Sequence, residues 1–487
     1  MVKRPLRYRK PCSRERGVAL LMVLSALTIL AVMLTEFQQE TSAELGSAMS
    51  ERDSVQAEYS AKSAIALTRL IIAAEPTIRN NLTFLLMATG LGGQVQIPVW
   101  QHSELLLSIF NDKNAASKFG SMLGSSLEQT KGLGLPGSRF EVTIVDEDSK
   151  LNFNYAARGT VPANMVVTNQ FLSLVRGAQY DPIFEGRDPD GNFRDRRLTC
   201  SALVDWVDPN IEADPCTPEQ MTAAQTSTED SFYEQLKVPY ARKNAAFDSL
   251  EELHLVRGVD DEFWNTFIDP NPDDPKKRNV TVWGSDKVNI NTANGYTLVT
   301  LICQFAQASP ACTDPVMRSK IVSVIEMVRG FVPGVPFFKS PSNFVSQLNP
   351  DPNNKNIDML AMMLSAVGVP PIQVNASLLK ERIKVKSDIF SIYATGIVKS
   401  GKRETTTRIQ AVVDFRGAPP PGQNRQATDL MMAAGMSHDA IAAPSASASA
   451  SAQAIPAGMD PSLVTPESIL AALQASAGGH IIYYRIN

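Results

Sequence analysis

The sequence contains few of the side chains on which most enzymes and zinc sites depend. Its 487 residues include only four histidines and five cysteines. The histidines are scattered, no Ser/His/Asp spacing or nucleophile elbow occurs, and no cysteine pair has CxxC spacing. Residues 396–403 come close to a phosphate-binding loop, but Arg403 stands where Mg²⁺ needs Ser or Thr. The sequence therefore gives no basis for an enzyme.

Charge is absent from one stretch near the N-terminus. Val18–Leu34 contains no charged residue, whereas residues 1–17 carry seven Lys/Arg and one acid, Glu15. As a helix this stretch covers roughly 26 Å, just short of a ~30 Å bilayer core. The positive-inside rule keeps the basic segment in the cytoplasm and sends the rest of the chain across the membrane. We expect a single-pass inner-membrane protein with its bulk in the periplasm.

Three kinds of segment share this pattern. A secretory signal has a shorter apolar core and a small-residue cleavage site, which Thr35–Gln38 does not offer. A plain signal anchor fits the physics. The third reading is a resemblance: a basic leader ending in Gly17 before an apolar helix is similar to the leader of type IV prepilins and pseudopilins. It implies that a prepilin peptidase cuts after Gly17 and leaves Val18 as an N-methylated N-terminus.

The remainder of the chain is acidic. Without residues 1–17, 39 Lys/Arg remain against 49 Asp/Glu, so the net charge changes from −4 to −10. A negative surface repels phosphate backbones, which argues against a nucleic-acid partner and suits the periplasm.

Four cysteines outside the leader fall into two local pairs. These are Cys200 with Cys216 and Cys303 with Cys312. In an oxidising compartment we expect each pair to close a loop as a disulfide. The alternative is four partly buried free thiols.

Periodicity divides the chain into an α+β arrangement. Four-residue spacing predicts one helix over residues 18–75, transmembrane over 18–34 and ended by Pro76. Alternation predicts a strand at 139–146, a hairpin within 386–416 and a last strand at 481–485. The expected units are a core's first part (76–164), an inserted all-α domain (165–385), the core hairpin (386–416), a low-complexity Ala/Ser/Pro segment (417–460) and a C-terminal helix and strand (461–487). One small antiparallel sheet, packed on the long helix and interrupted by a helical domain, explains this order.

A cluster of acids marks the helical block. No basic residue and eight carboxylates lie between Leu198 and Leu236. Hard oxygen ligands with flexible spacing are those that Ca²⁺ takes, and an uncompensated cluster repels itself. We expect a calcium site on a loop, with ligands drawn from Asp205, Asp208, Asn210, Glu212 and Glu229. The alternative is a solvated acidic loop, since no EF-hand pattern is matched.

Three other motifs support simpler structures. Asp188–Asn192 looks like half a calcium loop, but the arginines around it favour a plain turn. Leu253–Val259 and Val288–Ala293 look like parts of helix-hairpin-helix modules. The first lies among acids, the wrong charge for phosphate, and the second lacks the glycine hairpin that should follow. We expect both to make protein contacts rather than to bind DNA.

Several motifs in colinear order resemble the general secretion pathway protein K family, the large minor pseudopilins of type II secretion systems. They are Gly17/Val18, Asp146 with Lys150–Asn154, Leu203–Asp208, Glu229–Tyr233, Pro239–Asn244, Ser249–Leu253 with Val256 and Gly258, and Val288–Ala293. The resemblance covers most of residues 14–416 and the terminal strand. It implies a pseudopilin fold with a large inserted α-domain, bound calcium, and a place at the pseudopilus tip. There the family helps to initiate assembly for the export of folded periplasmic proteins across the outer membrane.

The resemblance also implies partners. They are the minor pseudopilins of the I, J and H types, the major pseudopilin and the prepilin peptidase, with the secretin and secreted substrates as further candidates. Ser227-Thr228 replaces the usual Gly-Ala before the Glu-Asp element, which leaves the calcium ligands open, and segment 417–460 is unusual for the family.

The fifth mature residue is Met22, where most pilins carry Glu. That carboxylate is thought to neutralise the N-terminal ammonium of a neighbour in lipid, where an uncompensated charge is costly. Met22 cannot offer this to a subunit above, but the Val18 ammonium can still pair with a Glu below. The residue therefore suits an assembly role at the end of a filament.

Two other functions remain open at this point. One is a membrane-anchored periplasmic binding protein unrelated to pili, which would retain its leader. The other is a DNA-binding competence-type minor pilin, which would need an affinity for DNA that the acidic domain does not favour.

We predict that Met22→Glu leaves folding and membrane insertion intact, because the added carboxylate can pair with an N-terminal ammonium. The measurement is the amount of full-length protein in the membrane fraction, compared with wild type. Loss of insertion or of accumulation would show that this electrostatic account is wrong.

Overall fold

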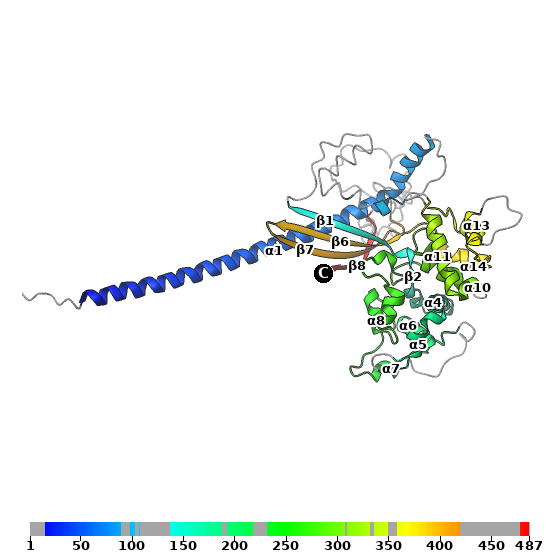
Figure 1. The fold of residues 1–487 in the computed structure, drawn as a ribbon, viewed down its shortest axis with the longest axis horizontal. Coiled ribbons are helices and arrows are strands. Elements are labelled where there is room, and N and C mark those ends of the chain that lie inside the picture. Colours follow the sequence, from blue (N-terminus) through cyan, green and yellow to red (C-terminus); the bar gives the residue numbers. More distant parts are fainter. Residues whose placement is uncertain are drawn as a thin grey trace, which may run out of the picture.

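A long helix, a four-stranded sheet and a helical domain make up the described part of the protein (Figure 1). The structure is a computed structural model. It describes residues 15–88, 98–102, 107, 137–187, 191, 193–217, 231–306, 309–331, 336–348, 358–418 and 478–486. Most of the predicted low-complexity segment 417–460, and the predicted helix after it, lie outside these residues.

The first element, α1, runs from Glu15 to Ala88 over 74 residues. At ~1.5 Å per residue it is about 110 Å long. The prediction that Pro76 ends this helix is wrong, because α1 continues for three further turns. Proline removes one backbone hydrogen bond and crowds the preceding turn, which bends a helix without necessarily ending it. Figure 1 shows the C-terminal part of α1 turned away from the axis of the rest.

The sheet has the strand order β1-β6-β7-β8, with every neighbouring pair antiparallel. Its strands are β1 (Ser138–Asp146), β6 (Ile389–Ser400), β7 (Arg403–Asp414) and β8 (His480–Ile486). The predicted hairpin and terminal strand are confirmed. Asp146 at the end of β1 lies opposite Phe390 near the start of β6, although 244 positions separate them in sequence. One sheet is therefore interrupted by an insertion, as the sequence predicts.

Helix α1 packs on this sheet through small side chains. Ala57, Ala61 and Ala64 are fully buried, and they face an apolar layer from three strands. The closest approach is at Gly396 in β6, where an added Cβ would lie 1.9 Å from the Ala57 carbonyl oxygen. Only glycine leaves room for the helix backbone there.

Polar side chains on either side of the buried stretch Ala57–Ala64 also hold α1 to the sheet. Asp53 on α1 is fully buried and forms an ion pair of 2.8 Å with Arg403 at the start of β7. Arg69 donates hydrogen bonds to the carbonyls of Gly478 and Gly479, just before β8. The helix is thus joined to the start of β7 and to the residues just before β8.

The inserted domain lies between β1 and β6. Its helices are α4 (Val161–Leu174), α5 (Asp181–Glu185), α6 (Arg196–Val207), α7 (Ser231–Glu234), α8 (Asp261–Phe263), α9 (Gly295–Gln304), α10 (Pro310–Thr313), α11 (Pro315–Arg329), α12 (Pro341–Leu348), α13 (Met359–Ala366) and α14 (Ala376–Glu381). Its short helical turns are η2 (Glu147–Ser149), η3 (Phe153–Arg158), η4 (Ala178–Tyr180), η5 (Leu250–Leu255), η6 (Trp264–Ile268) and η7 (Pro275–Lys277), whereas η1 (Val99–His102) precedes β1. Fully buried phenylalanines, among them Phe153, Phe171 and Phe263, form one continuous core.

The sequence predicts an all-α inserted domain, but the domain also contains short strands. Two parallel strand pairs of two residues each lie within it: β2 (Leu151–Asn152) with β3 (Val280–Thr281), and β4 (Val288–Asn289) with β5 (Ile383–Lys384). A strand of two residues is too short to show the alternation of apolar and polar side chains by which strands are predicted. Both link the ends of the insertion to its interior.

We predict that Gly396→Ala lowers the free energy of unfolding by about 1–3 kcal/mol, because the new methyl group must push α1 off the sheet. Gly46→Ala is the matched control, since a Cβ there meets nothing within 4 Å and alanine favours a helix. Urea denaturation followed by tryptophan fluorescence measures both. Equal stability of Gly396→Ala and wild type would contradict the close contact.

Candidate functional site

The two halves of α1 have different surroundings. Within the described residues, one helix, Gly17–Glu75, is long and apolar enough to cross a membrane. Val18 and Met22 are 52% and 65% exposed, and a Cβ on Gly17 would meet nothing within 4 Å. The half that carries the predicted cleavage point therefore extends freely from the body, whereas the half around Ala61 is buried in it.

A buried charged network joins the sheet to the inserted domain. Asp148, directly after β1, is 1% exposed, and its carboxylate lies 2.6 Å from the Lys384 ammonium. The same carboxylate accepts hydrogen bonds from the backbone N–H groups of Ser285, Asp388 and Ile389. One side chain thus connects the end of β1, the domain and the start of β6.

Its neighbours extend this network, which we call the joint. Asp146 accepts hydrogen bonds from the hydroxyls of Thr292 and Ser387. Glu147 forms an ion pair of 3.1 Å with Lys150, and both are at most 3% exposed. These contacts tie the end of β1 to the inserted domain and to the residues just before β6.

Burial raises the pKa of the Asp146 carboxyl to about 7, and the negative charge of Asp148 acts in the same direction. The hydroxyls of Ser387 and Thr292 oppose this rise. The folded protein therefore binds this proton more tightly than the unfolded chain does.

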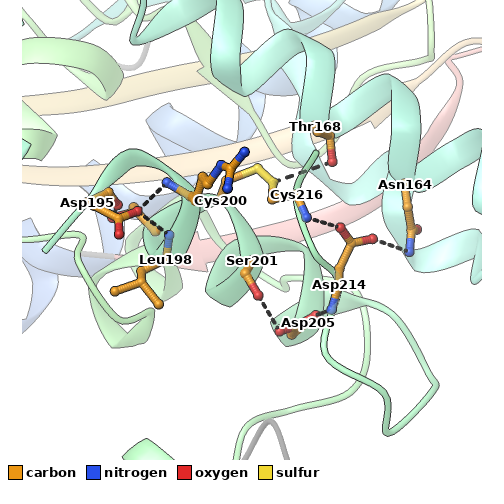
Figure 2. Close-up of a disulfide and its surroundings, with 11 residues drawn as sticks. Asn164, Thr168, Asp195, Leu198, Cys200, Ser201, Asp205, Asp214 and Cys216 are labelled. Carbon is orange, nitrogen blue, oxygen red and sulfur yellow. Dashed lines mark hydrogen bonds between the residues drawn. A yellow bond between two sulfur atoms is a disulfide. The ribbon is translucent and has the colours of Figure 1, made fainter. Parts of the chain in front are cut away.

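The acidic cluster surrounds the C-terminal end of α6 (Figure 2). Asp205 lies in the last turn of this helix and not on a loop, which corrects the sequence prediction. Its carboxylate accepts hydrogen bonds from the Ser201 hydroxyl and, at 2.7 Å, from the Asp214 backbone N–H. Asp205 therefore holds the loop 208–216 against the helix.

Asp208 is the centre of the cluster, and it is fully buried. One of its oxygens accepts hydrogen bonds from the side-chain amides of Asn164 (2.9 Å) and Asn210 (2.6 Å). Asn164, on α4, also donates to the Asp214 carboxylate at 3.4 Å. The second oxygen of Asp208 and the amide oxygen of Asn164 are buried, and no described residue donates a hydrogen bond to either of them.

The structure brings together only some of the predicted calcium ligands. Asp205, Asp208 and Asn210 lie together, Glu212 is exposed, and Glu229 lies outside the described residues. Asn164 was not predicted, because it lies 44 positions from Asp208 on another helix and no local motif marks it.

The electrostatics of the cluster favour a cation. Burial raises the pKa of Asp205 to about 7, and the negative charges of Asp208 and Asp214 act in the same direction. Burial also raises the pKa of Asp208 and of Asp214. Two buried oxygens without donors are what a hard cation would coordinate. In the described part of the chain, however, no three acidic, histidine or cysteine side chains converge as a metal site. The donor chemistry fits calcium, and the described ligand set is partial.

Both predicted disulfides are present. Cys200 on α6 is bonded to Cys216, so the bridge encloses the acidic loop (Figure 2). Cys303 at the end of α9 is bonded to Cys312 on α10. Cross-links of this kind typically stabilise a fold by about 2–4 kcal/mol.

The remaining motifs serve internal contacts. Asn291, in the second helix-hairpin-helix-like motif, exchanges two hydrogen bonds of 3.0 Å with the Phe338 backbone. Asn289 donates to Ser387 at the joint. The protein contacts expected of this motif are therefore made within the chain. In the 188–192 turn, only Gly191 is described, and its carbonyl accepts a hydrogen bond from Arg187.

We predict that Asp146→Asn reduces the pH dependence of stability. Because the folded pKa lies above the unfolded value of about 3.9, wild-type stability should fall as pH rises from about 4 to about 7. The free energy of unfolding of the variant minus that of wild type should be at least about 1 kcal/mol larger at pH 8 than at pH 5. Urea denaturation at both values measures this, with the exposed Asp273→Asn as control. Parallel pH profiles for wild type and Asp146→Asn would contradict it.

Comparison with known proteins assigns this region. Residues 149–268, which include part of the joint and the acidic cluster, match the family model described as Type II secretion system (T2SS), protein K. None of the curated proteins matches the chain. The crystal structure of the GspK-GspI-GspJ complex from the enterotoxigenic Escherichia coli type 2 secretion system aligns over 57% of this chain and 76% of that chain. The sequence identity is 16% and the TM-score 0.33. Residues 149–268 of this chain are therefore similar to protein K of the type II secretion system.

Proposed function

We propose that the protein ends the pseudopilus at its tip and helps to initiate pseudopilus assembly. The observation that carries this proposal is the position of the inserted domain. In Figure 1 the domain lies at the end of the sheet opposite to the free half of α1. A filament of this class grows by packing the N-terminal helices side by side, so a domain at that end would obstruct a subunit stacked above.

Met22 supports the same position. It lies in the second turn of α1 and is exposed, where a neighbour in lipid would approach. Without a carboxylate there, the subunit cannot neutralise the ammonium of a subunit above it. The joint adds a mechanical reason, because its buried ion pairs hold the domain in one direction relative to the helix.

The proposal includes an inner-membrane anchor with most of the chain in the periplasm. The one apolar helix and the basic leader support it. The partners are the I, J and H minor pseudopilins, the major pseudopilin and the prepilin peptidase, with the secretin and secreted substrates as further candidates. The role is structural and not enzymatic: buried acids such as Asp148 are engaged in holding the fold.

We also propose that calcium binds at the acidic cluster. Asp208, Asn164 and Asp214 would hold it, and its charge would offset the repulsion between the buried carboxylates. Its effect would be to fix the loop that the Cys200–Cys216 disulfide encloses.

The leader gives the decisive experiment. Protein extracted from membranes should begin at Val18 with a methylated amine, as read by N-terminal sequencing and mass spectrometry. Gly17→Val should retain the leader, because the peptidase of this class cuts after glycine. Gly46→Val in the same helix is the matched control and should be cut normally. An uncut wild-type leader would instead favour a membrane-anchored periplasmic binding protein.

Calcium removal tests the second proposal. Calcium at about 100 times its Kd should raise the free energy of unfolding by about 2.7 kcal/mol over the value in chelator. Asp208→Asn should abolish this increment, and Asp273→Asn, an exposed acid, should leave it unchanged. Thermal denaturation in chelator, calcium and magnesium measures it. A wild-type protein indifferent to calcium, or an equal response from Asp208→Asn, would refute the site.

A further inference from the structure

A cavity of about 490 Å³ opens in the inserted domain, away from the acidic cluster. It is lined by the end of α4, the turn η6, the N-terminal end of α9 and one face of α11. Its volume lies within the range of about 300–1,000 Å³ that ligand sites occupy. None of the residues predicted from the sequence to bind a ligand lies in it.

The inner end of the cavity carries uncompensated positive charge. Arg318, on α11, is 6% exposed, and its guanidinium donates to the carbonyl oxygens of Arg176 (2.8 Å) and Ser173 (3.5 Å). Neither Arg318 nor Arg176 forms an ion pair with any carboxylate of the described residues. The two guanidinium groups are close enough that the charge of Arg176 lowers the pKa of Arg318, as burial does.

Two hydrogen bonds use only two of the five N–H groups of a guanidinium. A buried cation without a counter-ion is costly, so this arrangement favours an anion in the cavity. Arg318 also lies near the phenols of Tyr180 and Tyr296, which can donate to the same anion.

The one acid in the lining does not supply the missing charge. Glu326 is exposed, and its carboxylate oxygen lies 3.1 Å from where a Cβ on Gly295, at the start of α9, would stand. It also interacts with Arg329 on its own helix. Its charge is therefore already offset by the helix N-terminus and by that arginine.

The walls show which kind of anion fits. Tyr180 and Phe267 form an edge-to-face pair with ring centroids 4.7 Å apart, and Leu174 lies beside them. Tyr296 is 53% exposed at the rim. The rest of the wall is polar and includes Lys277, Asn279 and Asn294. A planar guanidinium beside aromatic side chains suits a carboxylate that is attached to an apolar group.

We propose that this cavity binds a carboxylate of a polypeptide, held by Arg318, with the neighbouring apolar residue packed against Tyr180 and Phe267. The open rim at Tyr296 lets the chain continue outwards. The carboxylate is either a C-terminus or an acidic side chain, since both present the same two oxygens. This site goes beyond the assembly role and does not depend on it.

Three short peptides distinguish the sources. They are acetyl-Gly-Phe-Leu as the free acid, the same peptide as the C-terminal amide, and acetyl-Glu-Phe-Leu-amide. Isothermal titration calorimetry with the full-length protein in detergent should show saturable binding of the free acid, of the Glu peptide, or of both. The neutral amide should bind at least about tenfold more weakly, because a charge-assisted hydrogen bond is worth about 1.5–3 kcal/mol. Equal binding of all three peptides, or of none, would overturn the proposal.

Variants locate the binding. Arg318→Gln should weaken the carboxylate peptides at least about tenfold and leave the amide unchanged. Lys320→Gln, on the same helix but not in the lining, is the matched control and should bind as wild type does. If thermal denaturation shows that Arg318→Gln does not fold, Tyr296→Ala replaces it, since this exposed side chain can be removed safely. That variant should lose about threefold or more in affinity, and unchanged affinity in the folded variants would refute the site.

Discussion

The close contact between α1 and β6 at Gly396 is the constraint on which the rest of the structure depends. At this point the helix backbone approaches the sheet so closely that an added Cβ would meet the Ala57 carbonyl oxygen at 1.9 Å. Small side chains at Ala57, Ala61 and Ala64 keep the helix there. Because this contact involves only part of α1, the segment that begins at Val18 remains free of the body. One helix therefore has a buried half that belongs to the folded body and an exposed half that extends from it.

The joint carries the second constraint. A strand that ends at Asp146 and a strand that begins at Ile389 must be neighbours, while a large helical domain leaves and returns between them. Asp148 and Lys384 make that connection with buried charge. Such pairs contribute little net stability, since desolvation offsets their attraction, but a wrong arrangement would leave a charge buried alone. The joint therefore serves orientation more than stability.

Within the inserted domain, two regions depart from charge balance in opposite directions. Among the described residues, buried oxygens around Asp208 lack donors, and the buried guanidinium of Arg318 lacks a counter-ion. We propose that calcium offsets the first and a carboxylate offsets the second. The first is enclosed by a disulfide next to the end of α6, and the second opens to solvent beside Tyr296.

The sequence alone determined the features that depend on local order. The charge-free run from Val18, the alternation of the β6–β7 hairpin and the spacing of the cysteines each act over a few residues, so pattern was sufficient. Separation of the strands by a helical block also predicted the insertion. The tertiary structure decided what long-range contact controls. It carried α1 past Pro76, placed Asp205 in a helix, and brought Asn164 to Asp208 and Arg318 to Tyr180. No local sequence pattern predicts these contacts, because each joins side chains from elements that become neighbours only when the core packs.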